Sequence, residues 1–168
     1  MSKLSIQKLR HNDIKQQAAI HSLSFRKAYQ GIIPDNFLEK YTIEKSEKAF
    51  ISRYEESVDT YTIKNDSDLI GFSTFGHCRD EDKSLNTGEI QCIYIHPSFW
   101  HKGFGSVLFD FTVSELFYRK YNEITLWVLE LNLTARQFYE HKGFQSDGSK
   151  KEIKLGIDLT EIRYRLNK

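Results

Sequence analysis

One segment near the middle of the chain limits the possible folds more than any other. Residues 88–109 read GEIQCIYIHPSFWHKGFGSVLF, in which an apolar run passes through a short loop with two glycines into a second apolar run. The first run is apolar on both faces, as expected of a strand in the middle of a sheet. The second run is typical of a packed helix. The segment therefore predicts a central strand, a glycine-containing loop and a helix in immediate succession.

The loop of this segment has the chemistry of an anion site. The backbone N–H groups of residues 102–106 stand at the start of a helix, where they converge and carry the positive end of its dipole. Glycine at 103 and 105 keeps side chains away from an approaching phosphate, and Lys102 can add a charge at the rim. The alternative is a glycine turn that binds nothing, because such turns are frequent. Leu108 occupies the third position of a dinucleotide-binding GxGxxG pattern, and the P-loop pattern is also not matched.

The front third of the chain predicts a short strand followed by helices. The strand falls in SIQKLR, and Asn12 or Asp13 is placed to cap a helix that runs to about Tyr29. Pro34 suits the first turn of a second short helix. Thr42 is placed to cap a third helix that runs to Tyr54.

The remaining segments predict strands with one further helix. DTYTIKN and LIGFSTFGHC form an expected antiparallel hairpin, and ITLWVLE is an expected buried strand. LTARQFYEHKG is an expected helix that stops at Gly143. The tail TEIRYRL alternates, which places Ile162, Tyr164 and Leu166 on one face and the polar residues Glu161, Arg163 and Arg165 on the other.

Size and charge narrow the class of protein. A chain of 168 residues fits a single domain, expected over 1–168, and a net charge of +1 gives no sustained basic field, so we expect no nucleic-acid partner. No stretch approaches the roughly twenty apolar residues that span a bilayer, and the start has no signal-peptide core, so we expect a cytoplasmic protein with no membrane partner. Cys78 and Cys92 lie in apolar runs and are expected to be free thiols.

The histidines and the acidic loop favour no metal chemistry. The six histidines lack ligand spacings such as HxH or HExxH, and no metal is expected. Asp80, Glu81 and Asp82 could attract a cationic amine, but a solvated charged loop is the preferred interpretation. Cys92 could suggest an acyl-cysteine mechanism, yet an apolar strand would raise its pKa and no histidine is placed beside it.

Two segments together resemble the GNAT acetyltransferases. They are YIHPSFWHKGFGSVLF and LWVLELNLTARQFYEHKGF, which stand in the order and at the separation usual in that family. The resemblance implies a mixed α/β (α+β) fold, with a mostly antiparallel twisted sheet of six to seven strands flanked by about four helices. It also implies an acetyl-CoA-dependent N-acetyltransferase, an acyltransferase that uses acetyl-CoA as the acetyl donor. The chain departs from the family pattern at Trp100, where Arg or Gln is usual, and at His101, where Gly is frequent.

The resemblance assigns the donor site residue by residue. The loop would bind the pyrophosphate of coenzyme A, and the preceding strand would meet the pantetheine and acetyl group through its backbone. Asn132 matches a residue that hydrogen-bonds the cofactor, although it could instead cap the following helix. The expected cofactor-binding residues are Ile93, Tyr94, Ile95, His101, Lys102, Gly103, Phe104, Gly105, Ser106 and Asn132.

Acetyl transfer to an amine has its own requirements. An alkyl amine is mostly protonated at neutral pH, so a base or a proton-conducting water chain is needed, and the leaving thiolate needs an acid. Glu89 lies at the start of the central strand. Its separation from Gly103 is similar to that of the catalytic glutamate in the family's histone acetyltransferases, which makes it the expected base. The alternative is a solvated carboxylate at the end of a strand. Tyr139 matches the family's general-acid tyrosine, with a packed aromatic as the alternative. The backbone N–H of Ile93 is the expected oxyanion donor.

The sequence leaves the acceptor and the partners open. Tyr29, Phe37, Tyr41 and Phe75 suggest a partly aromatic acceptor pocket, whose guest is a primary amine of a small molecule or a peptide. A non-catalytic acyl-CoA-binding or protein-interaction module is the alternative to an enzyme, and Glu89 with Tyr139 favours the enzyme. Edge strands in this architecture commonly pair, which makes a homodimer a hypothesis.

Overall fold

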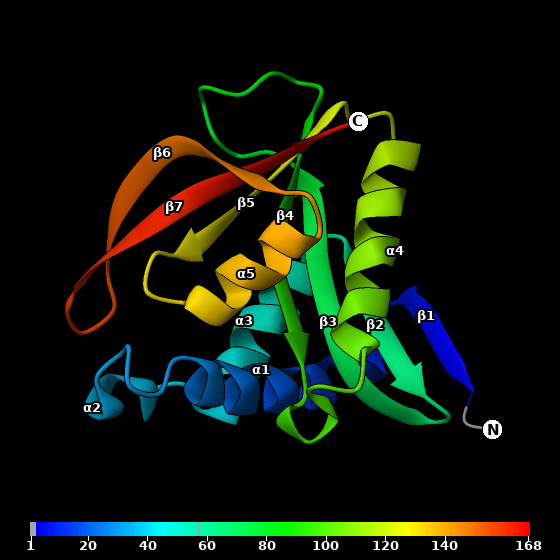
Figure 1. Cartoon of the computed structure of the whole chain (residues 1–168). Helices are drawn as coiled ribbons and strands as arrows, with labels where there is room; N and C mark the ends of the chain where they lie inside the picture. Colours follow the sequence, from blue (N-terminus) through cyan, green and yellow to red (C-terminus); the bar gives the residue numbers. More distant parts are fainter. Residues whose placement is uncertain (1–2, 57) are drawn as a thin grey trace.

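The protein is built on a single sheet that is mostly antiparallel. The computed structural model describes residues 3–56 and 58–168. Within them the sheet has the order β1-β2-β3-β4-β5-β7-β6, and β4 with β5 is its one parallel pair (Figure 1). The strands are β1 (Leu4–Lys8), β2 (Thr60–Asn65), β3 (Asp68–His77), β4 (Thr87–Ile95), β5 (Glu123–Leu129), β6 (Gln145–Lys154) and β7 (Asp158–Asn167).

Helices cover both faces of this sheet. Two longer helices, α1 and α3, pack on one face, where Ala18 and Phe50 meet Phe72 of β3. Helices α4 and α5 pack on the other face, where Phe109 meets Ile90 and Leu126. The helices are η1 (His11–Asp13), α1 (Ile14–Ala28), α2 (Asp35–Leu38), α3 (Ile43–Glu55), η2 (Pro97–Phe99), α4 (Phe104–Tyr118) and α5 (Leu133–His141). The predicted class, a mixed fold with flanking helices, is confirmed.

The predicted helix starts are correct, but one predicted cap works differently. Thr42 caps α3, since its Oγ1 accepts a hydrogen bond from Lys45 N at 3.3 Å. Asp13 does precede α1, yet its carboxylate makes no capping bond. It instead accepts a hydrogen bond from Lys64 Nζ of β2 at 2.9 Å. Asp13 therefore ties the start of α1 to the sheet.

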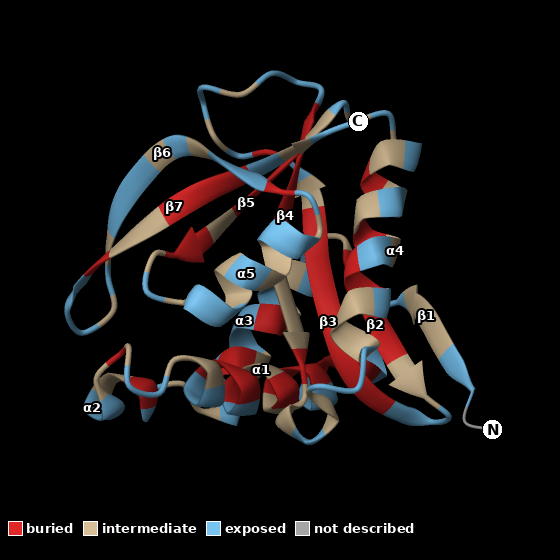
Figure 2. Ribbon diagram, viewed as in Figure 1, coloured by how far each residue is buried: buried red, intermediate tan, exposed pale blue. Residues whose placement is uncertain are grey.

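The C-terminal strands contain the two largest departures from the sequence predictions. Strand β6 was not predicted, because its residues are mostly polar and exposed, as suits the edge of a sheet (Figure 2). In β7, Ile162 and Tyr164 are buried as predicted. Arg163 was predicted on the polar, outward face, but it is only 4% exposed. A buried guanidinium requires partners, which the next subsection describes.

Strand β4 bends at one residue, and this bend opens the sheet. Thr74 pairs with Cys92 but Phe75 pairs with Ile90, so Gln91 is an extra residue in β4. Such a bulge bends its strand and increases the local twist. The parallel pairing of β4 with β5 ends two residues before the bulge, at the pair Glu89 and Thr125. Beyond that pair the two strands separate, and the sheet has a gap at its centre.

A histidine of α1 lies among aromatic rings beneath this sheet. The ring of His21 contacts Phe50 and Tyr94 edge-on, with centroid distances of 5.2 and 5.0 Å. Its Nδ1 lies 2.9 Å from Ser46 Oγ of α3. Burial, with a smaller contribution from the charge of Arg53, lowers the pKa of His21 to about 4 from its ordinary 6.5. The folded state therefore prefers the neutral ring.

This shift predicts an acid-sensitive contribution to stability. Because the pKa of His21 is lower in the folded state, its contribution is present above pH 6.5 and is lost as the pH falls toward 4. Between pH 7 and pH 5 we expect the free energy of unfolding to fall by about 2 kcal/mol more in the wild type than in His21→Gln. Urea denaturation of both proteins at the two pH values measures the difference. Equal losses would show that His21 is not the responsible group.

Candidate active site

A cavity of about 400 Å³ occupies the gap between β4 and β5. From the face that carries α4 and α5, Ile93 of β4 and Tyr139 of α5 line it. From the opposite face, Gln91, Trp127 and Glu161 line it, and Gln91 accepts a hydrogen bond from Arg53 of α3 at 2.5 Å. Gln91 and Ile93 are two positions apart, and the bulge at Gln91 turns its side chain to the face opposite Ile93. Residues from both faces of the sheet therefore line the cavity.

A second hollow, of about 290 Å³, lies over the glycine loop. It shares Ile95 and Trp100 with the first cavity, so the two hollows lie next to each other. Its other lining residues are Phe99, His101, Gly103, Gly105, Ser106 and Phe138. Together the hollows extend from the start of α4 to the gap in the sheet.

The glycine loop has the backbone geometry of an anion site. Gly103 is the residue before α4 and has a φ of 83°, a left-handed conformation that favours glycine. The N–H groups of the first helical turn, from Phe104 to Ser106, have no partner within a helix. A Cβ on Gly105 would lie 3.6 Å from Ile95 Cγ1, an ordinary contact, so this glycine is not required by the packing. The loop therefore has helix N–H groups without helix partners, and its role as a phosphate site stays a prediction.

The positive charge beside this loop comes from an unexpected residue. Lys102, the predicted rim cation, donates a hydrogen bond to the Ser98 carbonyl at 2.9 Å. Lys142, at the end of α5, donates to Ser106 Oγ and pairs with Asp110 at 2.7 Å. Lys142 therefore holds its ammonium beside the first turn of α4. Its position could not be predicted, because the contact joins residues 36 positions apart.

Trp100 is the residue that attaches the loop to the sheet. Its indole Nε1 donates a hydrogen bond to the Ile95 carbonyl at 2.6 Å. The same oxygen accepts a second hydrogen bond from Ser24 Oγ of α1 at 2.9 Å. The departure from the family pattern at this position is therefore an anchor that holds the loop against the end of β4.

Two tyrosines and an asparagine meet inside the central cavity. Tyr139 packs against Phe109 at a centroid distance of 5.6 Å, and burial raises its pKa above the ordinary value, so it is protonated at neutral pH. Asn132 caps α5 by accepting a hydrogen bond from Ala135 N at 3.2 Å. Burial raises the pKa of Tyr29 to about 12. Tyr29, Asn132 and Tyr139 were singled out from the sequence, and they line the cavity together with Ala135.

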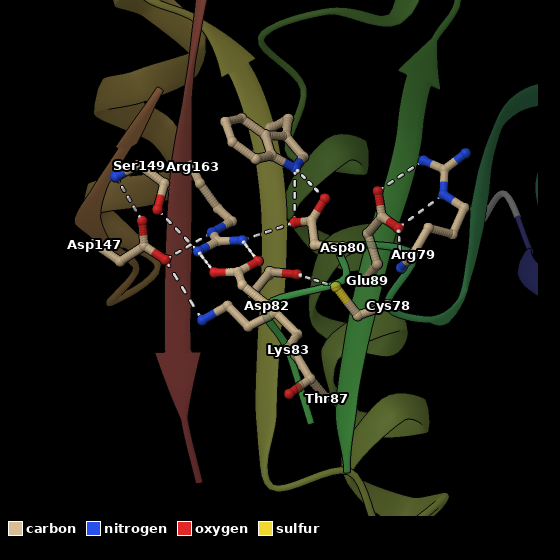
Figure 3. Close-up of polar contacts among 12 residues, drawn as sticks. Cys78, Arg79, Asp80, Asp82, Lys83, Thr87, Glu89, Asp147, Ser149 and Arg163 are labelled. Atoms are coloured by element: carbon tan, nitrogen blue, oxygen red, sulfur yellow. Dashed lines mark hydrogen bonds and ion pairs between the residues drawn. The ribbon is translucent and has the colours of Figure 1, made fainter. Parts of the chain in front are cut away.

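Glu89 lies outside the residues that line the cavity. It is only 3% exposed, and Arg79 donates to its two oxygens from Nε at 2.8 Å and from Nη2 at 2.7 Å (Figure 3). The backbone N–H of Arg79 adds a third hydrogen bond at 3.2 Å. Glu89 is thus not the solvated strand-end carboxylate that was the alternative interpretation. Its role as the base stays a prediction.

Of the predicted cofactor residues, eight line the two hollows and two do not. The two that do not are Phe104 and Lys102. Phe104 packs on Phe99 at a centroid distance of 6.0 Å, and the ammonium of Lys102 lies over the same ring. The residues on the lining are Ile93, Tyr94, Ile95, His101, Gly103, Gly105, Ser106 and Asn132.

The predicted aromatic acceptor pocket is only partly correct. Tyr29 lines the central cavity, but Phe75 is buried in the core under α4, where it stacks on Tyr61. Phe37 and Tyr41 pack with Phe25 beside α1. Trp127 and Glu161 also line the cavity, on the side opposite α5. The sequence alone singles out neither of them as a site residue.

The acidic loop after β3 is largely exposed, as expected of a solvated loop, but two of its carboxylates are also bonded to the sheet. Arg163 of β7 donates to Asp82 at 2.6 and 2.7 Å and to Asp80 at 3.0 Å (Figure 3). It also donates to Asp147 of β6 at 2.7 Å. The guanidinium lowers the pKa of Asp82 to about 2. Asp80 in turn accepts a hydrogen bond from Trp127 Nε1 at 3.0 Å. One arginine thus connects the loop to β6 and β7.

The opened sheet, the glycine loop beside it and the tyrosine in the gap have the arrangement that the resemblance to the GNAT acetyltransferases implies. The profile of the acetyltransferase (GNAT) family matches residues 24–144. The chain is 26% identical over 174 residues to the uncharacterized N-acetyltransferase YuaI of Bacillus subtilis (strain 168), covering 98% of this chain and 99% of the relative.

Two solved structures share the fold. The PaiA N-acetyltransferase from Thermoplasma acidophilum, in complex with coenzyme A, has a TM-score of 0.74 at 23% identity and covers 99% of both chains. The acetyltransferase YncA from Salmonella typhimurium, with acetyl-CoA, has a TM-score of 0.68 at 18% identity over 98% of this chain and 93% of that one. The chain therefore belongs to the acetyltransferase (GNAT) family and is an acyltransferase enzyme.

Two further observations concern membranes and metals. Within residues 3–56 and 58–168, no helix has the length and apolar character needed to span a membrane. In the same residues, no three side chains of the metal-ligating types gather into a group that could hold an ion.

The network around Arg163 predicts a large loss of stability on its removal. Arg163→Ala would leave the carboxylates of Asp147 and Asp80 without their main partner, and breaking a buried ion pair costs about 3 to 5 kcal/mol. Arg165→Ala is the matched control, because Arg165 is 48% exposed and lies 3.6 Å from Glu123. We expect the control to lose about 1 kcal/mol or less. Urea denaturation measures both, and similar losses would contradict the role given to Arg163.

Proposed function

We propose that this enzyme transfers an acetyl group from acetyl-CoA to a primary amine by direct attack within a ternary complex. The observation that carries the proposal is the cavity between β4 and β5, which side chains line from both faces of the sheet. A donor that enters from the glycine loop and an acceptor that enters from the opposite face would meet there without crossing. Direct transfer needs that arrangement, because both substrates must be bound at once.

The donor side of the cavity has the features that coenzyme A requires. Its pyrophosphate fits the free N–H groups at the start of α4, next to Gly103 and the ammonium of Lys142. The backbone of β4 from Ile93 to Ile95 lines the gap where the pantetheine and the acetyl thioester would lie. Related folds with coenzyme A and with acetyl-CoA bound support this donor.

Two side chains of the enzyme are proposed to move the protons. The amine nitrogen forms the new N–C bond after its proton passes to Glu89, through water because Glu89 does not line the cavity. The C–S bond then breaks, Tyr139 donates its proton to the departing thiolate, and the remaining extra proton on the nitrogen passes to the Tyr139 oxygen, which gives the N-acetylamine, the thiol of coenzyme A and a protonated Glu89. Because the pKa of Tyr139 is raised, its hydroxyl is protonated at neutral pH and has a proton to donate. The backbone N–H of Ile93 is the proposed donor to the developing oxyanion.

The acid is tested by removing a single hydroxyl. Tyr139→Phe keeps the packing on Phe109 and should lower acetyl-CoA-dependent thiol release by about 10²-fold or more, with unchanged affinity for coenzyme A. A panel of primary amines is assayed with both proteins, and coenzyme A binding is measured by calorimetry. Turnover within a factor of two of the wild type would exclude Tyr139 as the acid. Tight coenzyme A binding without turnover on any amine would instead support the non-catalytic module.

The base is tested with Glu89→Gln. This change keeps the shape of the side chain and leaves Arg79, whose side chain is 61% exposed, in contact with water. We expect kcat to fall by about 10²-fold or more at neutral pH and to recover as the pH approaches the pKa of the free amine. Thermal denaturation of the variant checks that the ion pair is not simply a structural requirement. A pH profile identical to that of the wild type would show that another group takes the proton.

A further inference from the structure

A lysine of β6 places its ammonium against the acceptor side of the central cavity. Lys151 Nζ lies 4.1 Å from the centroid of the Trp127 ring. The same Nζ lies 3.2 Å from Glu161 Oε2. Lys151 pairs with Glu161 across β6 and β7, so its side chain must cross β7 to reach the indole on β5. The chain therefore binds one of its own alkylammonium groups between an aromatic face and a carboxylate.

The indole that receives this ammonium is held in a fixed orientation. Trp127 Nε1 donates to both oxygens of Asp80, at 3.2 and 3.0 Å. Asp80 is in turn held by Arg163 Nη1 at 3.0 Å. A ring that is oriented before a ligand arrives loses little further freedom on binding, which favours affinity. The Arg163 network thus maintains an aromatic surface beside the gap in the sheet.

Trp127 and Glu161 line the cavity, whereas Lys151 does not. Glu161 is also the one carboxylate among the residues that line it in the described part of the chain. Its side chain is 21% exposed and that of Lys151 is 44% exposed, so the ion pair is in contact with solvent. Such pairs are weak, and another ammonium can replace the lysine at little cost.

We propose that Trp127 and Glu161 form the specificity site for the acceptor, which binds as a primary alkylammonium, and that Lys151 competes with it for this site. The inference rests on the proposed amine acetyltransferase activity and names the chemical class of its acceptor. An indole face attracts an alkylammonium, and a carboxylate adds a charge-assisted hydrogen bond. An aromatic amine, uncharged at neutral pH, gains neither contact.

The test compares the removal of two neighbouring lysines. Lys151→Ala removes the competing ammonium. Lys150→Ala removes the same charge, but Lys150 pairs with Glu130 at 2.7 Å, and the cations that lie over the Trp127 ring in the described part of the chain are Lys151 and Arg163. The probe is n-butylammonium chloride, which has the chain of a lysine side chain, and n-butanol is its uncharged control. The dissociation constant is measured by NMR line broadening of the probe, which does not depend on turnover.

We expect Lys151→Ala to bind n-butylammonium about fivefold more tightly than the wild type, and Lys150→Ala to match the wild type. Trp127→Leu should weaken binding by about fivefold, and Trp127→Phe should retain part of the affinity because it keeps an aromatic face. In the thiol-release assay, Lys151→Ala should lower the KM of an alkylamine by a similar factor with little change in kcat.

The outcomes separate this inference from the proposed function. Equal effects of Lys151→Ala and Lys150→Ala, or equal binding of n-butanol, would overturn the specificity site even if the wild type acetylates amines. Tighter ammonium binding in Lys151→Ala without acetyl transfer by any of the proteins would support the site and refute the proposed reaction.

Discussion

The structure depends on the loss of pairing between β4 and β5 after Glu89. A parallel pair in the middle of a sheet would normally continue along its whole length, and its backbone groups would satisfy one another. Here the extra residue Gln91 bends β4, while β5 stays paired with β7 as far as Leu129. The interrupted pairing leaves backbone donors and acceptors facing a cavity instead of a neighbouring strand. Every proposed function of this enzyme uses that opening.

Side-chain contacts flank the opening. Arg53 of α3 donates to Gln91 on one side of the gap. On the other side, Arg163 joins the loop after β3 to β6 and β7, across the strand that carries Trp127. The Arg163 contacts therefore connect the two halves of the sheet. The charged residues of β6 and β7, which suggest only a solvated edge, are therefore part of the frame around the site.

Local signals in the sequence were enough for the glycine loop and for most of the elements. Gly103 and Gly143 adopt the positive φ that glycine favours, and the Thr42 side chain caps its own helix. Each of these effects is confined to a single turn of the chain. The polar strand β6 had no such signal, since its pairing with β7 is the only reason for its extended backbone. The burial of Arg163 and the inward position of Phe75 also depend on partners that are distant in sequence. The resemblance to the family identified Tyr139 and Asn132, whereas Trp127 and Glu161 required the fold.

The Ile95 carbonyl is shared by two segments that serve different ends of the site. Trp100 of the glycine loop and Ser24 of α1 both donate to this one oxygen. Phe25 of α1 and Tyr29, which directly follows α1, line the cavity, while the loop lies at the proposed phosphate end. A shift of α1 must therefore be accommodated at an atom that also positions the loop. Because both segments bond to one backbone atom, the glycine loop and α1 keep a fixed position relative to each other at the end of β4.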